Sequence, residues 1–156
     1  MGLVEVSIEG AVATLTLNRP EQRNALSAQL CDAIVDALVA IGRDDAARVM
    51  IVRGAGETFC SGADFAAVSG STGPDFLPAF ERMLEAVAGF ELPTIAAIRG
   101  AALGGGLQLA TVCDFRIATT DARLGIPSSR LGIVVTLRTS SAWCCWSGSQ
   151  RRRRCS

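Results

Sequence analysis

The sequence contains no histidine, no tyrosine and no lysine, and all fifteen of its basic residues are arginine. Without histidine it cannot build a Ser/His/Asp triad, an imidazole general base or a metal site based on two histidines. Without lysine it cannot form a Schiff base, a P-loop phosphate contact or a pyridoxal-phosphate anchor. The chemistry left to this chain therefore belongs to backbone amides, carboxylates, thiols and hydroxyls.

Long apolar runs are missing too, since no stretch reaches the roughly 18 residues that a membrane-spanning helix needs. The start, MGLVEVSIEGAV, lacks a cationic patch followed by an apolar stretch and a cleavage site, so we expect no secretory signal and a cytoplasmic protein. Of the 156 residues, 49% are hydrophobic and 19% charged, which excludes a disordered chain. This length and composition predict one folded domain or a piece of a larger one.

The composition changes near residue 136. All fifteen acidic residues lie at or before Asp121, whereas residues 136–156 hold five arginines, both tryptophans and three of the six cysteines. The run Arg151–Arg154 can indicate a nucleic-acid or anionic-membrane patch, or an incidental solvated charge run. We prefer a third interpretation, because the codons of Trp143–Trp146, read one base earlier, must spell Val-Leu-Leu. Permitted codons for the neighbouring residues extend that reading into an amphipathic helix.

We therefore expect a frameshift near Val135 or Thr136. Residues 1–135 are then an incomplete folded core and residues 136–156 an aberrant, disordered tail, and we expect no nucleic-acid partner and no membrane span.

The body of the chain alternates strand and helix patterns. Two alternating or β-branched runs flank Glu9-Gly10, which predicts a hairpin, and later strands alternate with helices, which predicts an α/β domain with mostly parallel neighbours. The expected strands are Leu3–Ile8, Ala11–Leu17, Arg48–Val52, Thr94–Ile98 and Phe115–Ala118, and the expected helices are Ala28–Ile41 after a Ser27 cap, Pro74–Phe90 and Leu107–Val112.

Two glycine-bearing turns follow predicted strands, and each leaves backbone N–H groups available to an anion. The first turn ends at Ala63-Asp64, and the second contains Gly104–Gly106 ahead of a small-residue helix. Taken singly, the first turn is more often an ordinary surface turn, and the alternative for the second is a flexible turn with close helix packing. The pair suggests two N–H donors that share one oxyanion, whereas GxGxxG is absent and a Rossmann dinucleotide site is unsupported.

Four segments in this order resemble the enoyl-CoA hydratase/isomerase (crotonase) family, and the resemblance covers nearly all of residues 3–135. They are RPEQRNALS (19–27), GETFCSGADF (56–65), LPTIAAIRGAALGGGLQLATVCDFRIA (92–118) and ARLGIPSSRLGIV (122–134). The resemblance implies the crotonase-like (ClpP/crotonase) α/β fold of β-β-α units, here the N-terminal core with the C-terminal helices missing. It also implies an acyl-CoA ligand, a lyase role in fatty acid metabolism, no cofactor beyond coenzyme A as part of the substrate, and no metal. Full-length relatives are expected as homotrimers or dimers of trimers.

The same resemblance assigns site residues. The amides of Ala63 and Gly105 become the donors that polarise the thioester carbonyl, and the Asn24–Leu26 segment lies against the CoA nucleotide. Of the four arginines that could meet CoA phosphates, Arg23 ranks first for its motif position, with solvated surface arginines as the alternative; the others are Arg19, Arg53 and Arg99. The expected substrate-binding residues are Arg23, Asn24, Ala25, Leu26, Ser61, Gly62, Asp64, Gly104 and Gly106.

Two departures from the family pattern bear on catalysis. Hydratases of this family carry glutamates at the positions of Gln108 and Ser128. Neither an amide nor a neutral hydroxyl titrates near neutrality, and losing a positioned acid or base costs about 10²–10⁴ in rate. The nearby carboxylates of Asp64 and Asp114 are expected to play structural roles. Acyl-CoA binding without efficient hydration is therefore expected; the alternatives are an active isomerase-like or hydrolase-like enzyme with unassigned acid and base groups, and a nonfunctional fragment.

The cysteines show neither a CxxC motif nor metal-ligand spacing. Cys31, Cys60 and Cys113 are expected as buried small hydrophobes. Cys60, just before the first glycine turn, is the one thiol worth testing for reactivity.

Overall fold

The computed structural model describes residues 2–64 and 73–126, and within them a five-stranded sheet forms the framework. The strand order is β1-β2-β3-β4-β6. β1 (Val4–Glu9) and β2 (Val12–Leu17) form an antiparallel hairpin around Gly10, which has φ +59°. β3 (Val49–Gly54), β4 (Thr94–Ile98) and β6 (Phe115–Ala118) then continue the sheet in parallel. The predicted hairpin and the parallel sheet that follows it are confirmed.

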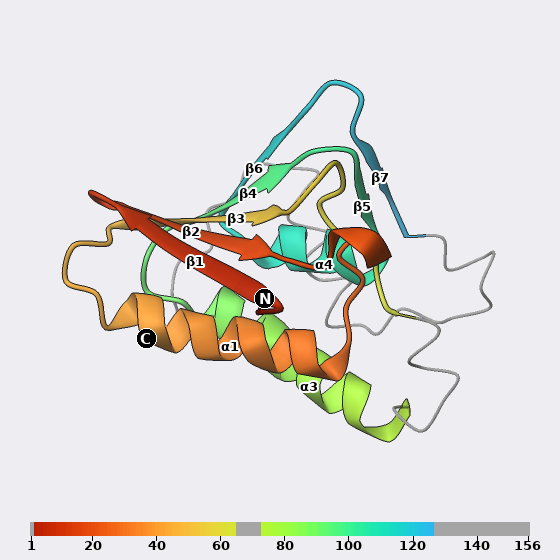
Figure 1. The fold of residues 1–156 in the computed structure, drawn as a ribbon, viewed down its shortest axis with the longest axis horizontal. Coiled ribbons are helices and arrows are strands. Elements are labelled where there is room, and N and C mark those ends of the chain that lie inside the picture. Colours follow the sequence, from red (N-terminus) through yellow and green to blue (C-terminus); the bar gives the residue numbers. More distant parts are fainter. Residues whose placement is uncertain (1, 65–72, 127–156) are drawn as a thin grey trace. The chain divides into compact units, whose positions relative to one another are not determined.

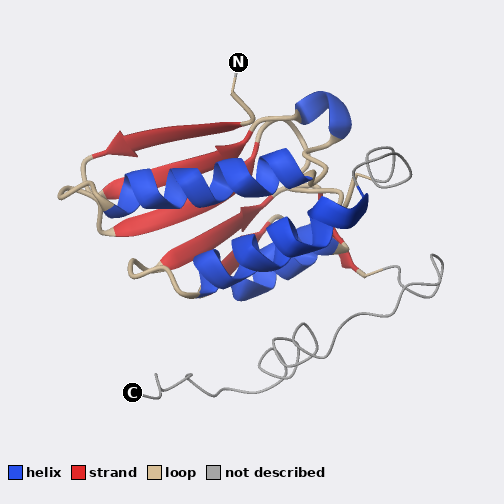
Figure 2. Cartoon of the chain, turned by 90° about the horizontal axis from the view of Figure 1, so that it is seen from below, coloured by secondary structure: helices blue, strands red, loops and turns tan. Residues whose placement is uncertain are grey.

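The helices lie on one face of this sheet (Figures 1 and 2). α1 (Ala28–Gly42) begins at the predicted cap, where the Ser27 hydroxyl accepts from the Leu30 N–H at 3.2 Å. α3 (Gly73–Ala88) packs beside α1, and α4 (Gly105–Val112) packs against α3. Because apolar residues recur at helical spacing along α1, that helix can bury one complete stripe.

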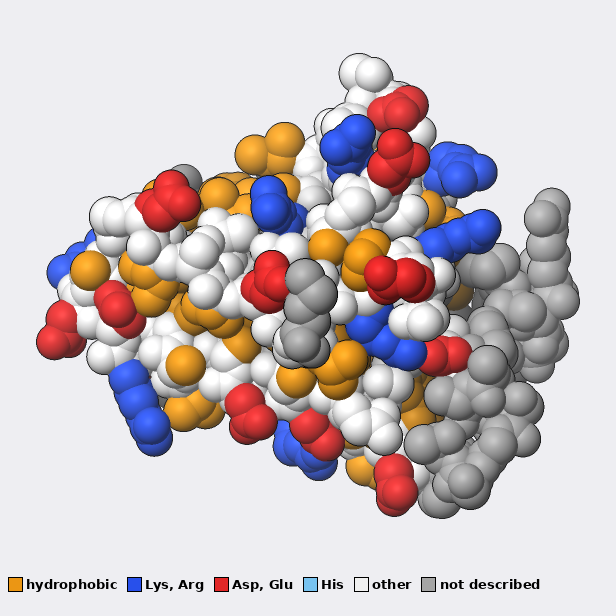
Figure 3. All heavy atoms as spheres, viewed as in Figure 1, with side chains coloured by type: hydrophobic (Ala, Val, Ile, Leu, Met, Phe, Trp, Pro, Cys, Tyr) orange, Lys and Arg blue, Asp and Glu red, His pale blue; other side chains and the backbone are white. Residues whose placement is uncertain are grey.

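The core lies between the helices and the sheet. Its fully buried large side chains include Leu15, Leu17, Met50, Val52 and Phe59 with Leu30, Ile34, Ile41, Met83, Val87 and Leu109. β6 differs from the other strands, because all four of its residues are exposed, with Phe115 61% and Ile117 65% accessible. Figure 3 shows apolar side chains protruding at the edge where Figure 1 draws β6.

Three short elements were not predicted from the sequence pattern. β5 (Ala101–Leu103) and β7 (Arg123–Gly125) pair in parallel as a separate small sheet, and the 3₁₀ turn η1 (Pro20–Gln22) follows β2. The prediction of a helix starting at Leu107 is wrong by two residues, since Gly105 already belongs to α4. Within the described part of the chain, no helix is long and apolar enough to cross a membrane.

Candidate active site

The turn after β3 runs as an extended segment between two other pieces of chain. On one side, the Cys60 N–H donates to Ala101 O at 3.0 Å, and Cys60 O accepts from the Leu103 N–H at 3.0 Å. On the other side, Gly62 O accepts from the Leu26 N–H at 2.8 Å, and the Asp64 N–H donates to Leu26 O at 2.9 Å. This doubly paired segment attaches the first glycine turn to both β5 and the chain ahead of α1.

The pairing with Leu26 leaves the Ala63 amide unused. In a parallel bridge, the residue opposite Leu26 turns its own N–H and C=O away, while its two neighbours make the hydrogen bonds. No hydrogen bond among the described residues uses the Ala63 N–H. Ala63 is only half-buried.

The second glycine turn offers its donor through a helix N-terminus. Gly104 caps α4 with φ +50°, and the first intrahelical bond runs from the Gln108 N–H to Gly104 O at 3.1 Å. The N–H of Gly105, at the first helical position, therefore has no intrahelical acceptor. It also lies at the positive end of the α4 dipole, which favours negative charge at this point.

The two turns meet at Gly62. A Cβ placed on Gly62 would lie 3.6 Å from Gly105 N and 2.9 Å from Leu103 O, and Gly62 has φ +99°. Since Ala63 N is joined to Gly62 Cα through a single carbonyl carbon, covalent geometry keeps the Ala63 and Gly105 nitrogens within about 7.5 Å of each other. Two N–H donors can share one oxygen when their nitrogens lie within about 6.4 Å of each other, a separation that this bound allows.

Glycines let these segments approach. A Cβ on Gly106 would lie 2.5 Å from Cys60 O and 2.7 Å from Cys60 Sγ, so Gly106 is a packing residue beneath the turn. A Cβ on Gly105 would lie 3.2 Å from both Leu26 Cδ1 and Phe80 Cε2. Leu26 and Phe80 thus border the N-terminus of α4 with apolar surface, and Phe80 stacks on Phe76 at 5.5 Å between ring centroids.

The Asn24–Leu26 segment is buried. Asn24 is 0% exposed at φ +54°; its Nδ2 donates to Ala55 O at 2.9 Å and to Thr58 O at 2.7 Å, and its Oδ1 accepts from the Arg19 N–H at 2.9 Å. The Asn24 side chain therefore holds two loops together. Its assignment to the CoA nucleotide stays a prediction.

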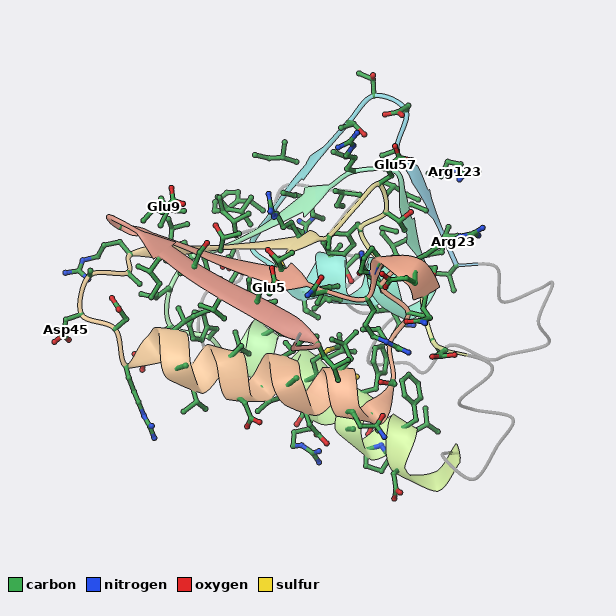
Figure 4. All side chains as sticks on the ribbon, viewed as in Figure 1. Glu5, Glu9, Arg23, Asp45, Glu57 and Arg123 are labelled. Atoms are coloured by element: carbon green, nitrogen blue, oxygen red, sulfur yellow. The ribbon has the colours of Figure 1, made fainter. Side chains whose placement is uncertain are left out.

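The four arginines differ in their freedom to bind phosphate. Arg19 Nη1 donates to Ala25 O at 2.7 Å and Nη2 pairs with Asp64 Oδ2 at 3.0 Å, so its guanidinium is already engaged. Arg53 Nε donates to the Thr16 hydroxyl at 3.2 Å. Arg23 and Arg99 are exposed, and Arg23 projects from the end of η1 (Figure 4). No local sequence pattern indicates the Arg19–Asp64 pair, because 45 positions separate these residues.

The nearby carboxylates have structural partners, as expected. Asp114 Oδ2 accepts from the Thr94 N–H at 2.8 Å and from the Thr94 hydroxyl at 2.9 Å, which joins β4 to the end of α4. Asp64 pairs with Arg19. Gln108 is half-buried on α4, one turn beyond Gly105, and Ser61 is half-buried with its N–H donating to Arg23 O at 3.1 Å. Ser128 and residues 136–156 lie outside the described residues.

The three thiols in the described part of the chain are buried. Cys31, Cys60 and Cys113 are buried, and burial raises the pKa of each thiol to about 12. The expectation that they are buried is confirmed, and the raised pKa of Cys60 disfavours the thiolate that a reactive cysteine needs. Among residues 2–64 and 73–126, no group of three or more cysteine or carboxylate side chains could hold a metal ion.

Comparison with known proteins gives a consistent result. The family model described as enoyl-CoA hydratase/isomerase matches residues 7–151. A probable enoyl-CoA hydratase from Bacillus subtilis is 38% identical over 138 residues, covering 86% of this chain and 53% of that protein. A crotonyl-CoA hydratase from Syntrophomonas wolfei is 39% identical over 129 residues, covering 80% and 50%. The crystal structure of an enoyl-CoA hydratase/carnithine racemase from Magnetospirillum magneticum has a TM-score of 0.85 at 32% identity, covering 92% and 56%. The chain spans about half the length of the curated relatives it matches.

Proposed function

The chain belongs to the enoyl-CoA hydratase/isomerase family, and we propose that it forms the acyl-thioester-binding part of a crotonase-type site. In this proposal the N–H groups of Ala63 and Gly105 donate to the thioester carbonyl oxygen of an acyl-CoA. Coenzyme A enters as part of the substrate, with no resident cofactor or metal. The observation that carries the proposal is the meeting of the two glycine turns at Gly62.

The chemistry of this arrangement is stabilisation of an enolate. When a proton leaves or joins the α-carbon of a thioester, negative charge develops on the carbonyl oxygen. Preorganised backbone donors facing that charge contribute roughly 3 kcal/mol each to the transition state. The dipole of α4 adds to the donor strength of Gly105, and the apolar flank of Leu26 and Phe80 lowers the local dielectric.

Hydration of an enoyl thioester requires acid and base groups in addition to the two N–H donors. Adding water across a conjugated double bond needs a base for the water and an acid for the α-carbon. Gln108 can donate or accept a hydrogen bond one turn from Gly105, but its amide does not exchange a proton near neutrality. We therefore propose binding and polarisation of the thioester with slow hydration. An isomerase-like or hydrolase-like enzyme that uses other groups is the second candidate, since Gln108 keeps a polar side chain at this position.

Calorimetric titration of the 156-residue chain with butyryl-CoA and with free coenzyme A tests the proposal. The matched variants are Gly105→Ala and Gly105→Pro: both add a Cβ, but only proline removes the N–H while still fitting the first position of a helix. We expect butyryl-CoA to bind the alanine variant at least about tenfold more tightly than the proline variant, which is the affinity carried by one good hydrogen bond. No preference for butyryl-CoA over free coenzyme A in the unchanged chain would instead favour a nonfunctional fragment.

A further inference from the structure

Arg19 makes two directed contacts at the end of β2. Its Nη1 donates to Ala25 O at 2.7 Å, and its Nη2 pairs with Asp64 Oδ2 at 3.0 Å. The two side chains of the pair are largely withdrawn from water, with 17% of the Arg19 side chain and 15% of the Asp64 side chain exposed. The planar guanidinium has a fixed angle between its two arms, so one arginine sets the relative position of both acceptors.

Those acceptors flank a single backbone bridge. Ala25 directly precedes Leu26, Asp64 directly follows Ala63, and Leu26 and Ala63 are the bridged pair. Leu26 itself bonds only to the neighbours of Ala63, through Gly62 O and the Asp64 N–H. The Arg19 fork therefore clamps the two segments of the bridge together, through Ala25 on one segment and Asp64 on the other.

We propose that Arg19 is a positioning residue of the thioester site, which acts through Asp64 to aim the Ala63 N–H at the oxygen that it shares with Gly105. The inference rests on the proposed function, since it concerns the direction of a donor that the function requires. A hydrogen bond weakens steeply as its angle departs from linearity, so a small rotation of the peptide between Gly62 and Ala63 would lower its effect on the carbonyl. The peptide that carries this N–H is held on its carbonyl side by the Leu26 N–H, which donates to Gly62 O, whereas no hydrogen bond among the described residues uses the Ala63 N–H itself. The contacts of Arg19 add to that hold from both segments of the bridge.

The clamp also occupies guanidinium nitrogens of Arg19 that a phosphate would otherwise contact. Its Nη1 donates to Ala25 O, and its Nη2 donates to Asp64 Oδ2. Arg82 and Asp32 form an ion pair of the same chemistry between α3 and α1, with side chains 56% and 52% exposed. This second pair supplies a matched control.

Isotope-edited infrared spectroscopy of butyryl-CoA labelled with ¹³C at the thioester carbonyl tests the inference. In the unchanged 156-residue chain, two donors should lower the carbonyl stretching frequency on binding. In Arg19→Met and Asp64→Ala we expect about half of that displacement or less, because one of two donors is misdirected, with binding about tenfold weaker. Arg82→Gln should keep the full displacement. Because the frequency is measured on bound ligand alone, a loss of folded protein would not reproduce this result.

The double variant Arg19→Met with Asp64→Ala should be no worse than either single variant, since the two residues act as one unit. If the carbonyl frequency shifts on binding to the unchanged chain and shifts by the same amount in both single variants, the inference is overturned and the proposed function stays intact. Absence of any displacement in the unchanged chain with bound ligand would overturn the proposed function, and the inference with it. If Arg19→Met does not fold by circular dichroism, Arg19→Lys replaces it, because it keeps the charge but loses the second arm of the fork. A full displacement in Arg19→Lys would also overturn the inference.

Discussion

Single residues account for most of the chemistry of the site and for its limits. Asn24 shows how a polar residue can be wholly structural, because its amide makes three hydrogen bonds within a buried turn. Gln108 and the buried thiols limit the chemistry of the site: Gln108 by its residue type, and the thiols by their burial. An amide cannot replace a titrating carboxylate, and a thiol kept from water does not ionise near neutrality.

The first prediction concerns the glutamate positions. In a version of the chain that continues in the alternative reading frame, Gln108→Glu with Ser128→Glu should raise the rate of crotonyl-CoA hydration by about 10² or more, because it restores both an acid and a base. The measurement is loss of the conjugated enoyl-thioester absorbance. Gln108→Ala with Ser128→Ala is the control, and robust hydration in that control would show that other groups perform the catalysis.

The second prediction follows from the raised thiol pKa values. The pKa of Cys31, Cys60 and Cys113 is about 12 in the folded chain against 9.0 for an ordinary thiol, so above pH 9 the unfolded state releases these protons first. The associated stability is fully present below pH 9 and is lost as the pH rises toward 12. Each thiol should contribute a slope of about 1.4 kcal/mol per pH unit to the falling free energy of unfolding.

Urea unfolding between pH 8 and 11 measures this slope, and the interpretation is simplified because tyrosine and lysine, which titrate in the same range, are absent. Cys113→Ala should reduce the part of the slope that comes from these three thiols by about one third. A free energy of unfolding that does not change over this range would contradict the prediction.

At the scale of elements, α4 and the turn after β3 form one unit through close backbone contact. Gly106 brings the helix directly against Cys60, and Gly62 brings the turn against Gly105. The donors thus depend on an interface between two elements that are more than forty positions apart in sequence. Small changes at this interface should alter the site without touching either donor.

Gly106→Ala tests that dependence. Because its Cβ would lie 2.5 Å from a backbone oxygen of Cys60, α4 must shift, and we expect a loss of about 2 kcal/mol in the free energy of unfolding with weaker butyryl-CoA binding. Gly42→Ala, at the last residue of α1, is the matched control. The added Cβ would lie 3.6 Å from Phe90 Cε2, which is an ordinary van der Waals contact. That substitution should be neutral or stabilising by up to about 1 kcal/mol. Equal behaviour of the two variants in denaturant melts would show that the interface is not tightly packed.

At the scale of the whole molecule, the exposed apolar residues decide the behaviour in solution. Phe115, Ile117 and Leu124 are 61%, 65% and 41% exposed on β6 and β7. At about 25 cal/mol per Å², uncovered apolar surface of this kind favours association. Full-length relatives are expected as trimers or paired trimers, whereas the 156-residue chain is expected to be monomeric or aggregated and marginally stable.

Size-exclusion chromatography measures the association state of the 156-residue chain, and a denaturant melt measures its stability; together they test this fourth prediction. Phe115→Ser with Ile117→Thr should reduce aggregation, because it removes apolar surface without changing the buried core. A monodisperse trimer with a cooperative transition would contradict the expectation. Reading the codons for Val135 and Thr136 separately tests whether a frameshift produced residues 136–156.

The sequence by itself predicted the hairpin, the parallel sheet, the main helices and the two glycine turns, because these depend on local periodicity, capping and turn residues. Residue types absent from the chain also limited its chemistry before any fold was known. The pairing of β5 with β7, the Arg19–Asp64 clamp and the burial of Asn24 depend on contacts between segments far apart in sequence, which no local pattern encodes. Tertiary structure alone brings Gly62 against Gly105, since only the packed sheet places the ends of two separate strand-turn units at the same point.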